Sequence, residues 1–391
     1  MSFACNPHVA AVVEPPIAEA KTWIEGCEFG ADRPLLDLAQ AVPSYPPARR
    51  LRDHLAERTG QFETAQYTDI RGTPALREVL ALHMASFYGA LSMDERNVLV
   101  TAGCNQAYCL ALMALARPGD EVILPLPYYF NHRMWLDALG VSVVHLPFRE
   151  ERGGVPDPQD AAARLTPRTR AIVLVSPNNP TGAAIPPAAL SAFKALAAER
   201  RVALVLDETY KDFEDEAAPR HNLFGDSSWG DTVVQLYSFS KSFSLTGYRV
   251  GSIVAGAAFI EQVAKLMDCV SICTSRIAQD GALYALENLW PWVHEKRVMM
   301  AERRTALLKV FESHNLGFTL VSTGAYFAYV RHPFAGEPAA GIARRLAREA
   351  AVLCLPGSVF GPGQEDYLRF AFANLEAERM PELGERLAAI G

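Results

Sequence analysis

Six short apolar runs, rich in valine, isoleucine and leucine, constrain the fold of this chain more than any other feature. Each run is bounded by turn residues, as buried parallel strands are. They cover residues 97–101, 121–125, 141–147, 171–176, 202–207 and 232–240. Helical stretches such as Asn105–Ala116 and Ala188–Glu199 lie between several of them. This alternation predicts an α/β fold, in which helices cover both faces of a mostly parallel sheet.

The sequence changes character from about residue 290, where a long charged helical stretch begins. Two short strand-like runs follow it, residues 324–330 and 366–373, and predict a smaller α+β unit. A chain of 391 residues is too long for one simple core. We therefore expect a large domain over residues 46–289 and a small domain over residues 290–391, with the proline-rich segment 1–45 packed against the small domain.

Charge and composition exclude several classes of partner. The formal net charge is −7, so the chain has no general attraction for nucleic acid. No segment reaches the roughly 18 consecutive apolar residues of a membrane span, and the N-terminus lacks the pattern of a signal peptide. The 7 cysteines form no Cys-x-x-Cys pair. We therefore expect free thiols, no metal site and a cytoplasmic protein.

A lysine with small hydroxyl neighbours follows the last of the six runs. In YSFSKSFSLTGYRVG, residues 237–251, Lys241 follows Ser238 and Ser240 and precedes Arg249. Hydroxyl groups and an arginine can bind a phosphate, and a lysine can bond a carbonyl cofactor covalently. The string taken alone also fits a solvated lysine in a loop.

Polar and aromatic residues follow three other runs. Asp207 ends its run, where a carboxylate can keep a pyridine nitrogen protonated, and Tyr210 lies three residues further on. Asn179, in SPNNPTG, can donate a hydrogen bond to a ring oxygen. Tyr129, in PLPYYFNH, can stack on a planar ring. Each residue also has an ordinary explanation, as a helix cap, a turn residue or a packing aromatic.

A glycine turn before a helix, in VTAGCNQAY, completes the set. The backbone amides of Gly103, Cys104 and Asn105 can bind an anion at the start of that helix. Because the carboxyl ends of parallel strands share one edge of a sheet, we expect all these positions to surround one ligand. A phosphate loop, an aromatic face, a ring-oxygen donor, a carboxylate and a lysine together predict pyridoxal 5′-phosphate (PLP).

On these motifs the chain resembles the class I and II aminotransferases, which are PLP enzymes of fold type I. Its motifs follow the order of that family along nearly the whole chain. They are YTDIRGTPALREVL (67–80), GCNQA (103–107), PLPYY (125–129), NNPTG (178–182), DETY (207–210), SFSKSFSLTGYRVG (238–251) and PGSVFGPGQEDYLRFAFA (356–373). The resemblance implies an enzyme that moves an amino group between an L-amino acid and a 2-oxo acid by a ping-pong mechanism.

The resemblance also implies a role for each motif residue. Lys241 bonds the cofactor and transfers protons, assisted by Asp207 and Tyr210, and Arg369 binds the substrate α-carboxylate. Tyr67 implies a homodimer, because the corresponding tyrosine reaches the cofactor phosphate of the neighbouring subunit. The other implied site residues bind the cofactor (Gly103, Cys104, Asn105, Tyr129, Asn179, Ser238, Ser240 and Arg249) or the substrate (Asn179 and Ala41).

One segment departs from the family pattern. Ala39-Gln40-Ala41 stands where many relatives have Gly-x-Gly beside the substrate carboxylate, so added methyl groups narrow that side of the pocket. We assign no arginine to a second substrate carboxylate. Arg276 lies in a segment that approaches the neighbouring active site in relatives, and we interpret it as an ion-pair residue.

Two other functions stay open on the sequence alone. The same fold supports a PLP-dependent C–S β-lyase, which releases pyruvate and ammonia without a 2-oxo acid acceptor. Related domains also serve as non-enzymatic, effector-sensing parts of transcription regulators that carry a basic helix-turn-helix module. The acidic composition of this chain disfavours the second alternative, and transamination is the preferred hypothesis.

Overall fold

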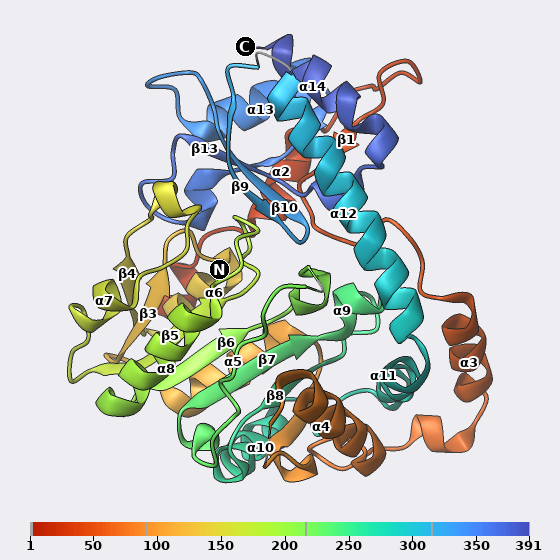
Figure 1. The fold of residues 1–391 in the computed structure, drawn as a ribbon, viewed down its shortest axis with the longest axis vertical. Coiled ribbons are helices and arrows are strands. Elements are labelled where there is room, and N and C mark those ends of the chain that lie inside the picture. The colour runs from red at the N-terminus through yellow and green to blue at the C-terminus, as the bar shows by residue number, and fades with distance from the viewer. Residues whose placement is uncertain (1–2, 91, 216, 314–315, 391) are drawn as a thin grey trace.

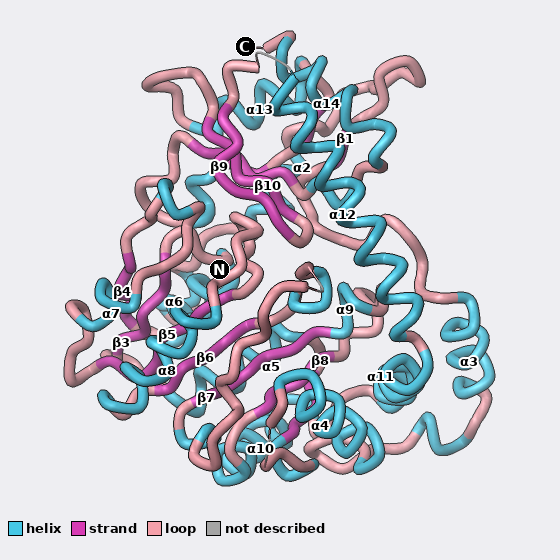
Figure 2. Tube along the Cα trace, viewed as in Figure 1, coloured by secondary structure: helices cyan, strands magenta, loops and turns pink. Residues whose placement is uncertain are grey.

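The computed structural model describes residues 3–390, apart from 91, 216, 314 and 315. The strands of this part of the chain form sheets of seven, four and two strands. In Figure 1 the seven-stranded sheet and its helices occupy the lower part of the molecule, and the four-stranded sheet lies above them. Figure 2 shows the two groups of strands in magenta, separated by loops.

The large sheet has the strand order β2-β8-β7-β6-β5-β3-β4. Only β8 runs against the others, because it pairs antiparallel with both β2 and β7. The six predicted strands are confirmed, whereas β8, a short run that begins with glycine and serine, was not predicted. The bounds are β2 (Val98–Thr101), β3 (Glu121–Pro125), β4 (Ser142–Leu146), β5 (Thr169–Val175), β6 (Ala203–Asp207), β7 (Val233–Ser238) and β8 (Gly251–Val254).

Helices cover both faces of this sheet, as predicted. Alternate residues of a strand point to opposite faces, so Leu204 and Leu206 of β6 join one core while Val205 joins the other. The first core is closed by α3 (Arg49–Thr59), α4 (Pro74–Tyr88), α7 (Pro158–Ala162), α8 (Pro187–Arg200) and α11 (Arg276–Asn288). The second is closed by α5 (Cys104–Leu115), α6 (Phe130–Leu139) and α10 (Ala257–Ser271).

The long helix α12 (Trp290–Ser313) leads from the large sheet to the four-stranded sheet. That sheet is antiparallel, in the order β12-β13-β10-β9. Its bounds, with those of the helices beside it, are β9 (Thr319–Gly324), β10 (Phe327–Arg331), α13 (Ala339–Glu349), β12 (Leu355–Pro356), β13 (Tyr367–Phe370) and α14 (Met380–Ala388).

The N-terminal segment packs against these C-terminal elements. After α1 (Pro7–Ala10) and α2 (Pro16–Thr22), the short strand β1 (Leu36–Asp37) pairs in parallel with β11 (Val352–Leu353). Ala20 and Trp23 lie in the same apolar core as Leu346 and Leu353. The division into residues 1–45, 46–289 and 290–391 stays a prediction. Within the described residues, no helix is long and apolar enough to cross a membrane.

Candidate active site

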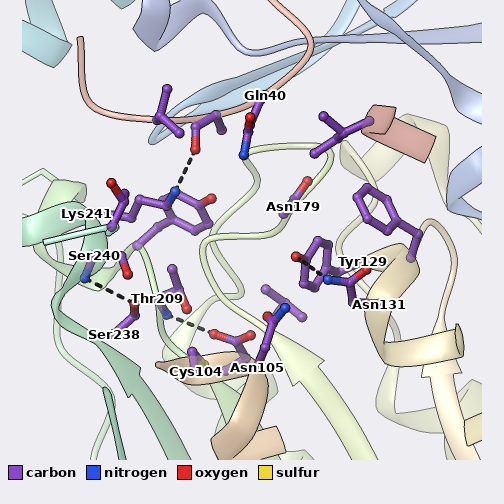
Figure 3. Close-up of a pocket in the computed structure, with 18 of the residues that line it drawn as sticks. Gln40, Cys104, Asn105, Tyr129, Asn131, Asn179, Thr209, Ser238, Ser240 and Lys241 are labelled. Atoms are coloured by element: carbon purple, nitrogen blue, oxygen red, sulfur yellow. Dashed lines mark hydrogen bonds between the residues drawn. The ribbon is translucent and has the colours of Figure 1, made fainter. Parts of the chain in front are cut away.

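A cavity of about 410 Å³ lies at the carboxyl ends of the parallel strands. Lys241, Asp207, Asn179 and Tyr129 reach it from β7, β6, β5 and β3, while Arg369 reaches it from β13. All but two of the site residues predicted from the sequence line this cavity, in part as labelled in Figure 3: Ala41, Cys104, Asn105, Tyr129, Asn179, Asp207, Tyr210, Ser238, Ser240, Lys241, Arg249 and Arg369.

The two remaining predicted residues lie elsewhere. Gly103 directly precedes α5 and lies beside Arg249, which lines the cavity. Tyr67 lies outside the cavity of its own chain, and 77% of its surface is exposed. This position leaves the Tyr67 side chain available to a second subunit.

Lys241 occupies the short helix α9 (Phe239–Ser242), which begins where β7 ends. Ser238 caps this helix, because its Oγ accepts a hydrogen bond of 3.2 Å from the amide of Ser240. The Lys241 Nζ donates a hydrogen bond of 2.6 Å to the carbonyl of Ala41 (Figure 3). Burial, and then the positive charges of Arg249 and Arg369, lower the pKa of Lys241 to about 8. The amine therefore loses its proton far more easily than an exposed lysine does.

Asp207 is a buried carboxylate that stays ionised. Its Oδ2 lies 3.4 Å from Nε2 of His132, and its Oδ1 accepts a hydrogen bond of 3.0 Å from the amide of Thr209. Burial alone would raise the pKa of Asp207, but His132 and Thr209 hold that pKa below its usual value. His132 is itself fixed by stacking on Tyr108, with ring centroids 3.9 Å apart. A negative charge is thus held at the bottom of the cavity.

Arg369 is buried and only partly satisfied. Its Nη1 donates a hydrogen bond of 2.9 Å to Oδ1 of Asn179, and its Nη2 donates to the carbonyl of Ala39. Its buried Nε has no partner among the described residues. Burial lowers the pKa of Arg369 to about 10, so the guanidinium stays charged at neutral pH. A buried guanidinium without a paired carboxylate favours an anion that enters the cavity beside it.

The start of α5 and Arg249 form one end of the cavity, called the phosphate end below because the sequence motifs predict a phosphate there. The first amides of a helix have no intrahelical acceptor, so they are free to bind an anion. Gly103 has φ +83°, and a Cβ at this residue would lie 2.4 Å from Nη2 of Arg249. Arg249 has a left-handed backbone, with φ 56°, and its Nη1 donates a hydrogen bond of 2.9 Å to the carbonyl of Thr246. The glycine therefore permits the arginine to approach the helix start.

Aromatic side chains line the middle of the cavity. The hydroxyl of Tyr129 accepts a hydrogen bond of 2.9 Å from Nδ2 of Asn131 (Figure 3). Burial raises the pKa of Tyr129 to about 12, so the phenol stays neutral. Tyr210 packs edge-on against Phe327, with ring centroids 5.1 Å apart. With the phosphate end, the lysine and the carboxylate, these rings make a site that fits PLP.

The sequence profile described as Aminotransferase class I and II matches residues 33–387. The chain belongs to this family. It is a PLP-dependent aminotransferase of fold type I, which transfers an amino group between an amino acid and a 2-oxo acid. The resemblance inferred from the sequence motifs is thereby confirmed.

Three known proteins illustrate the range of its relatives. Arginine–pyruvate transaminase AruH of Pseudomonas aeruginosa is 33% identical over 324 residues, which cover 82% of this chain and 81% of that protein. An aspartate aminotransferase of Pyrococcus horikoshii is 28% identical over 355 residues, or 90% of each chain. The solved aspartate aminotransferase of Thermus thermophilus with maleate is 27% identical and superposes with a TM-score of 0.91 over 100% of both chains.

The sequence analysis missed some residues of the cavity. His132 was visible in the PLPYYFNH motif, three residues after Tyr129 and so one helical turn along α6, but nothing in the sequence places it beside Asp207. Gln40 and Asn131 also line the cavity. The interpretation of Arg276 is confirmed, since its Nε lies 3.0 Å from Oδ1 of Asp280.

Proposed function

We propose that this aminotransferase holds PLP in the 410 Å³ cavity and that the predicted residues act there as the sequence motifs imply. When bound, PLP supplies an aldehyde carbon for the amino group and a ring that accepts electrons from the substrate. One observation carries the proposal: a buried lysine with a pKa of about 8, a buried ionised carboxylate and a buried, charged arginine line one cavity.

The chain would hold the two ends of PLP by different means. Arg249, the hydroxyls of Ser238 and Ser240 and the first amides of α5 would bind the phosphate. Asp207 would keep a proton on the ring nitrogen, because an ionised and buried carboxylate strongly favours a cation beside it. The ring would pack against Tyr129.

Asn179 links the cofactor to the substrate. Its Oδ1 already accepts a hydrogen bond from Arg369, so its Nδ2 is left to donate to the ring oxygen. Arg369 would bind the substrate α-carboxylate, and Ala41 would limit the space beside it. This grip fixes the substrate Cα, from which Lys241 would remove a proton as general base. Because its pKa is about 8, Lys241 exchanges that proton readily near neutral pH.

We also propose that the enzyme is a homodimer with shared active sites. Tyr67 and Phe62 are 77% and 75% exposed, which is unusual for aromatic residues so close together in a chain. A second copy that covered them would bring Tyr67 to the phosphate end of the neighbouring site. The cytoplasmic location stays a prediction.

A single-turnover experiment tests the proposed function. Each of a panel of L-amino acids is added to the PLP-loaded enzyme without a 2-oxo acid, and the visible band of the bound cofactor is followed. Transamination predicts loss of the band with release of one equivalent of a 2-oxo acid. A band that persists while pyruvate and ammonia accumulate from cystathionine would instead identify a C–S β-lyase. No reaction with any amino acid would support the non-enzymatic alternative.

A further inference from the structure

We propose that this active site selects amino acids whose side chains carry no charge, and that Gln40 is a specificity-determining residue. The inference deepens the proposed function and rests on it. It distinguishes this chain from relatives that are named for aspartate or arginine.

In the proposed function, the cofactor and the substrate α-carboxylate engage every charged side chain that lines the cavity. Among the described residues that line it, the charged ones are Asp207, Lys241, Arg249 and Arg369. In the proposed function Arg249 meets the cofactor phosphate, Asp207 meets the ring nitrogen, Arg369 meets the substrate α-carboxylate and Lys241 bonds the cofactor. Among the described residues of this chain, no lining cation is left for a second carboxylate, and no lining anion is left for a basic side chain.

The rest of the cavity wall toward the N-terminal segment is uncharged. It consists of the apolar residues Pro15, Ile17, Val42 and Phe130, and of the amides of Gln40 and Asn131. A charged side chain that enters this wall loses part of its water without gaining an oppositely charged partner, which is unfavourable. An apolar or amide side chain meets no such cost.

Gln40 is the free polar group of this wall. Its main-chain carbonyl is fixed by a hydrogen bond of 2.6 Å from Nδ2 of Asn374. Its side-chain amide has no hydrogen-bond partner among the described residues, and Figure 3 shows it directed toward the cavity near Asn179. An amide both donates and accepts, so it can bind a neutral polar group such as another amide. Asn131 is less available, because its Nδ2 donates to Tyr129.

Two arginines on α3 and α11, Arg58 and Arg276, are already paired within this chain. Arg276 and Arg58 both lie 3.0 Å from the carboxylate of Asp280. Neither lines the cavity of this chain. Movement of either arginine toward a substrate would break an ion pair that is largely shielded from water.

The test compares uncharged and charged donors in the single-turnover experiment. For each donor, the rate at which the cofactor band disappears is measured as a function of donor concentration, and the initial slope is compared. The uncharged donors are leucine, methionine and glutamine, and the charged donors are aspartate, glutamate and arginine. The structure predicts that the best uncharged donor exceeds every charged donor by at least about tenfold, the scale of discrimination that one unmatched group gives. A charged donor that matches or exceeds the uncharged donors overturns the inference and leaves transamination intact.

Two variants test the role of Gln40. Gln40→Arg adds a cation to the wall and should raise the rates with aspartate and glutamate relative to leucine by about tenfold or more. Gln40→Leu is the uncharged control and should lower the rate with glutamine relative to leucine without favouring the acidic donors. Unchanged preferences in Gln40→Arg would overturn the assignment of Gln40.

Binding gives a readout that does not depend on turnover. Calorimetry on the PLP-loaded enzyme compares 4-methylpentanoate, a neutral-tailed monocarboxylate, with maleate, a dicarboxylate. The structure predicts tighter binding of 4-methylpentanoate in the wild type and a shift toward maleate in Gln40→Arg. If no donor reacts at all, the proposed function fails. Tighter binding of maleate than of 4-methylpentanoate by the wild type would overturn the specificity inference, whether or not any donor reacts.

Discussion

The chemistry of Lys241 follows from its surroundings rather than from the residue itself. An exposed lysine has a pKa near 10.4 and is almost fully charged at neutral pH. Burial, Arg249 and Arg369 bring the pKa of Lys241 to about 8, close to the pH at which a general base works best. The hydrogen bond to the carbonyl of Ala41 fixes where its amine points.

Replacement of this lysine gives the first prediction. Lys241→Ala should remove the visible band of covalently bound cofactor and lower kcat by at least about 10²–10⁴-fold, the contribution of a positioned proton-transfer group. Absorbance spectra and steady-state assays measure both effects. Lys265→Ala is the matched control, since that amine is exposed and contacts only Gln262 among the described residues. Wild-type turnover in Lys241→Ala would remove the central assignment.

The pH dependence of cofactor attachment gives a second prediction. The neutral amine is the nucleophile, so the rate at which added PLP attaches to the apoenzyme should rise with pH and level off above about pH 8, the pKa of Lys241. An unperturbed lysine would keep gaining reactivity to about pH 10. Stopped-flow absorbance follows the reaction, with N-acetyl-lysine amide as the reference. A rate that still climbs at about pH 10 would contradict the lowered pKa.

The lowered pKa of Lys241 also determines how the free energy of unfolding changes with pH. A lysine whose pKa is lower in the folded state binds fewer protons there than in the unfolded chain, between about pH 8 and about pH 10. The contribution of Lys241 to the free energy of unfolding of the apoenzyme therefore rises with pH across that window. Below it, the buried charge opposes folding.

At the scale of elements, the start of α5 and the loop that carries Arg249 together form the proposed phosphate site. The helix presents its free amides, and Gly103 leaves the space that Arg249 needs. The glycine also adopts a positive φ, so two separate requirements meet at one residue. Their effects can be separated, because Gly119 has a similar φ of +89° with nothing within 4 Å of its missing Cβ.

A third prediction uses this pair. Gly103→Ala and Gly119→Ala should each lower the free energy of unfolding by about 1–3 kcal/mol, the cost of a positive φ for alanine. Only Gly103→Ala should also weaken PLP binding, by about tenfold or more, because its methyl group displaces Arg249 from the phosphate end. Urea unfolding of the apoenzymes and absorbance titration with PLP measure the two effects. Equal PLP affinities in both variants would refute the steric argument.

The elements also show what a sequence can and cannot predict. Buried parallel strands are continuous apolar runs, so six strands of the large sheet could be predicted from the sequence. The helices α5, α8 and α12 were also predicted. The short strands β8 and β9 were not predicted, because they contain glycine, serine and threonine, and pairing with neighbours far along the chain defines them. His132 was missed for a similar reason, since its contact with Asp207 joins α6 to the end of β6, 75 residues further along the chain.

At the scale of the whole molecule, the cavity is completed by both sheets. Arg369 of β13 reaches across to Asn179 in the loop after β5. Nearby, the backbones of Gly182 and Gly324 touch, since a Cβ at Gly182 would lie 2.3 Å from the amide nitrogen of Gly324. The loop after β5 therefore fixes both the position of Asn179 and its distance from the four-stranded sheet.

Subunit mixing gives a fourth prediction, which tests the shared site. Lys241→Ala homodimers should be inactive, and Tyr67→Ala homodimers should bind PLP more weakly because they lack the partner's phosphate ligand. A mixed dimer contains one subunit of each variant. One of its two sites combines Lys241 of the Tyr67→Ala subunit with Tyr67 of the Lys241→Ala subunit, so this site should be intact. We expect activity at limiting PLP to rise above the sum of the two variants after mixed refolding. Light scattering provides the control for dimer formation.

Two results would contradict the shared site or the homodimer. Activity in the mixture that equals the sum of the separate variants would mean that Tyr67 does not serve a neighbouring site. A monomeric mass with full activity would contradict the homodimer itself.

The hydrogen bonds of Arg369 have a consequence for the stability of the enzyme. The side chain joins β13, the loop after β5 and the main chain of Ala39, while its Nε has no hydrogen-bond partner among the described residues. An organic acid that binds the Arg369 guanidinium would bind only where all three segments are assembled. At 100 times its dissociation constant it should add about 2.7 kcal/mol to the free energy of unfolding. Scanning calorimetry should therefore give a higher Tm with 4-methylpentanoate than with 4-methylpentanamide. Simple carboxylate salts should accordingly stabilise the enzyme during storage, and they must be removed before kinetic work because they occupy the substrate site.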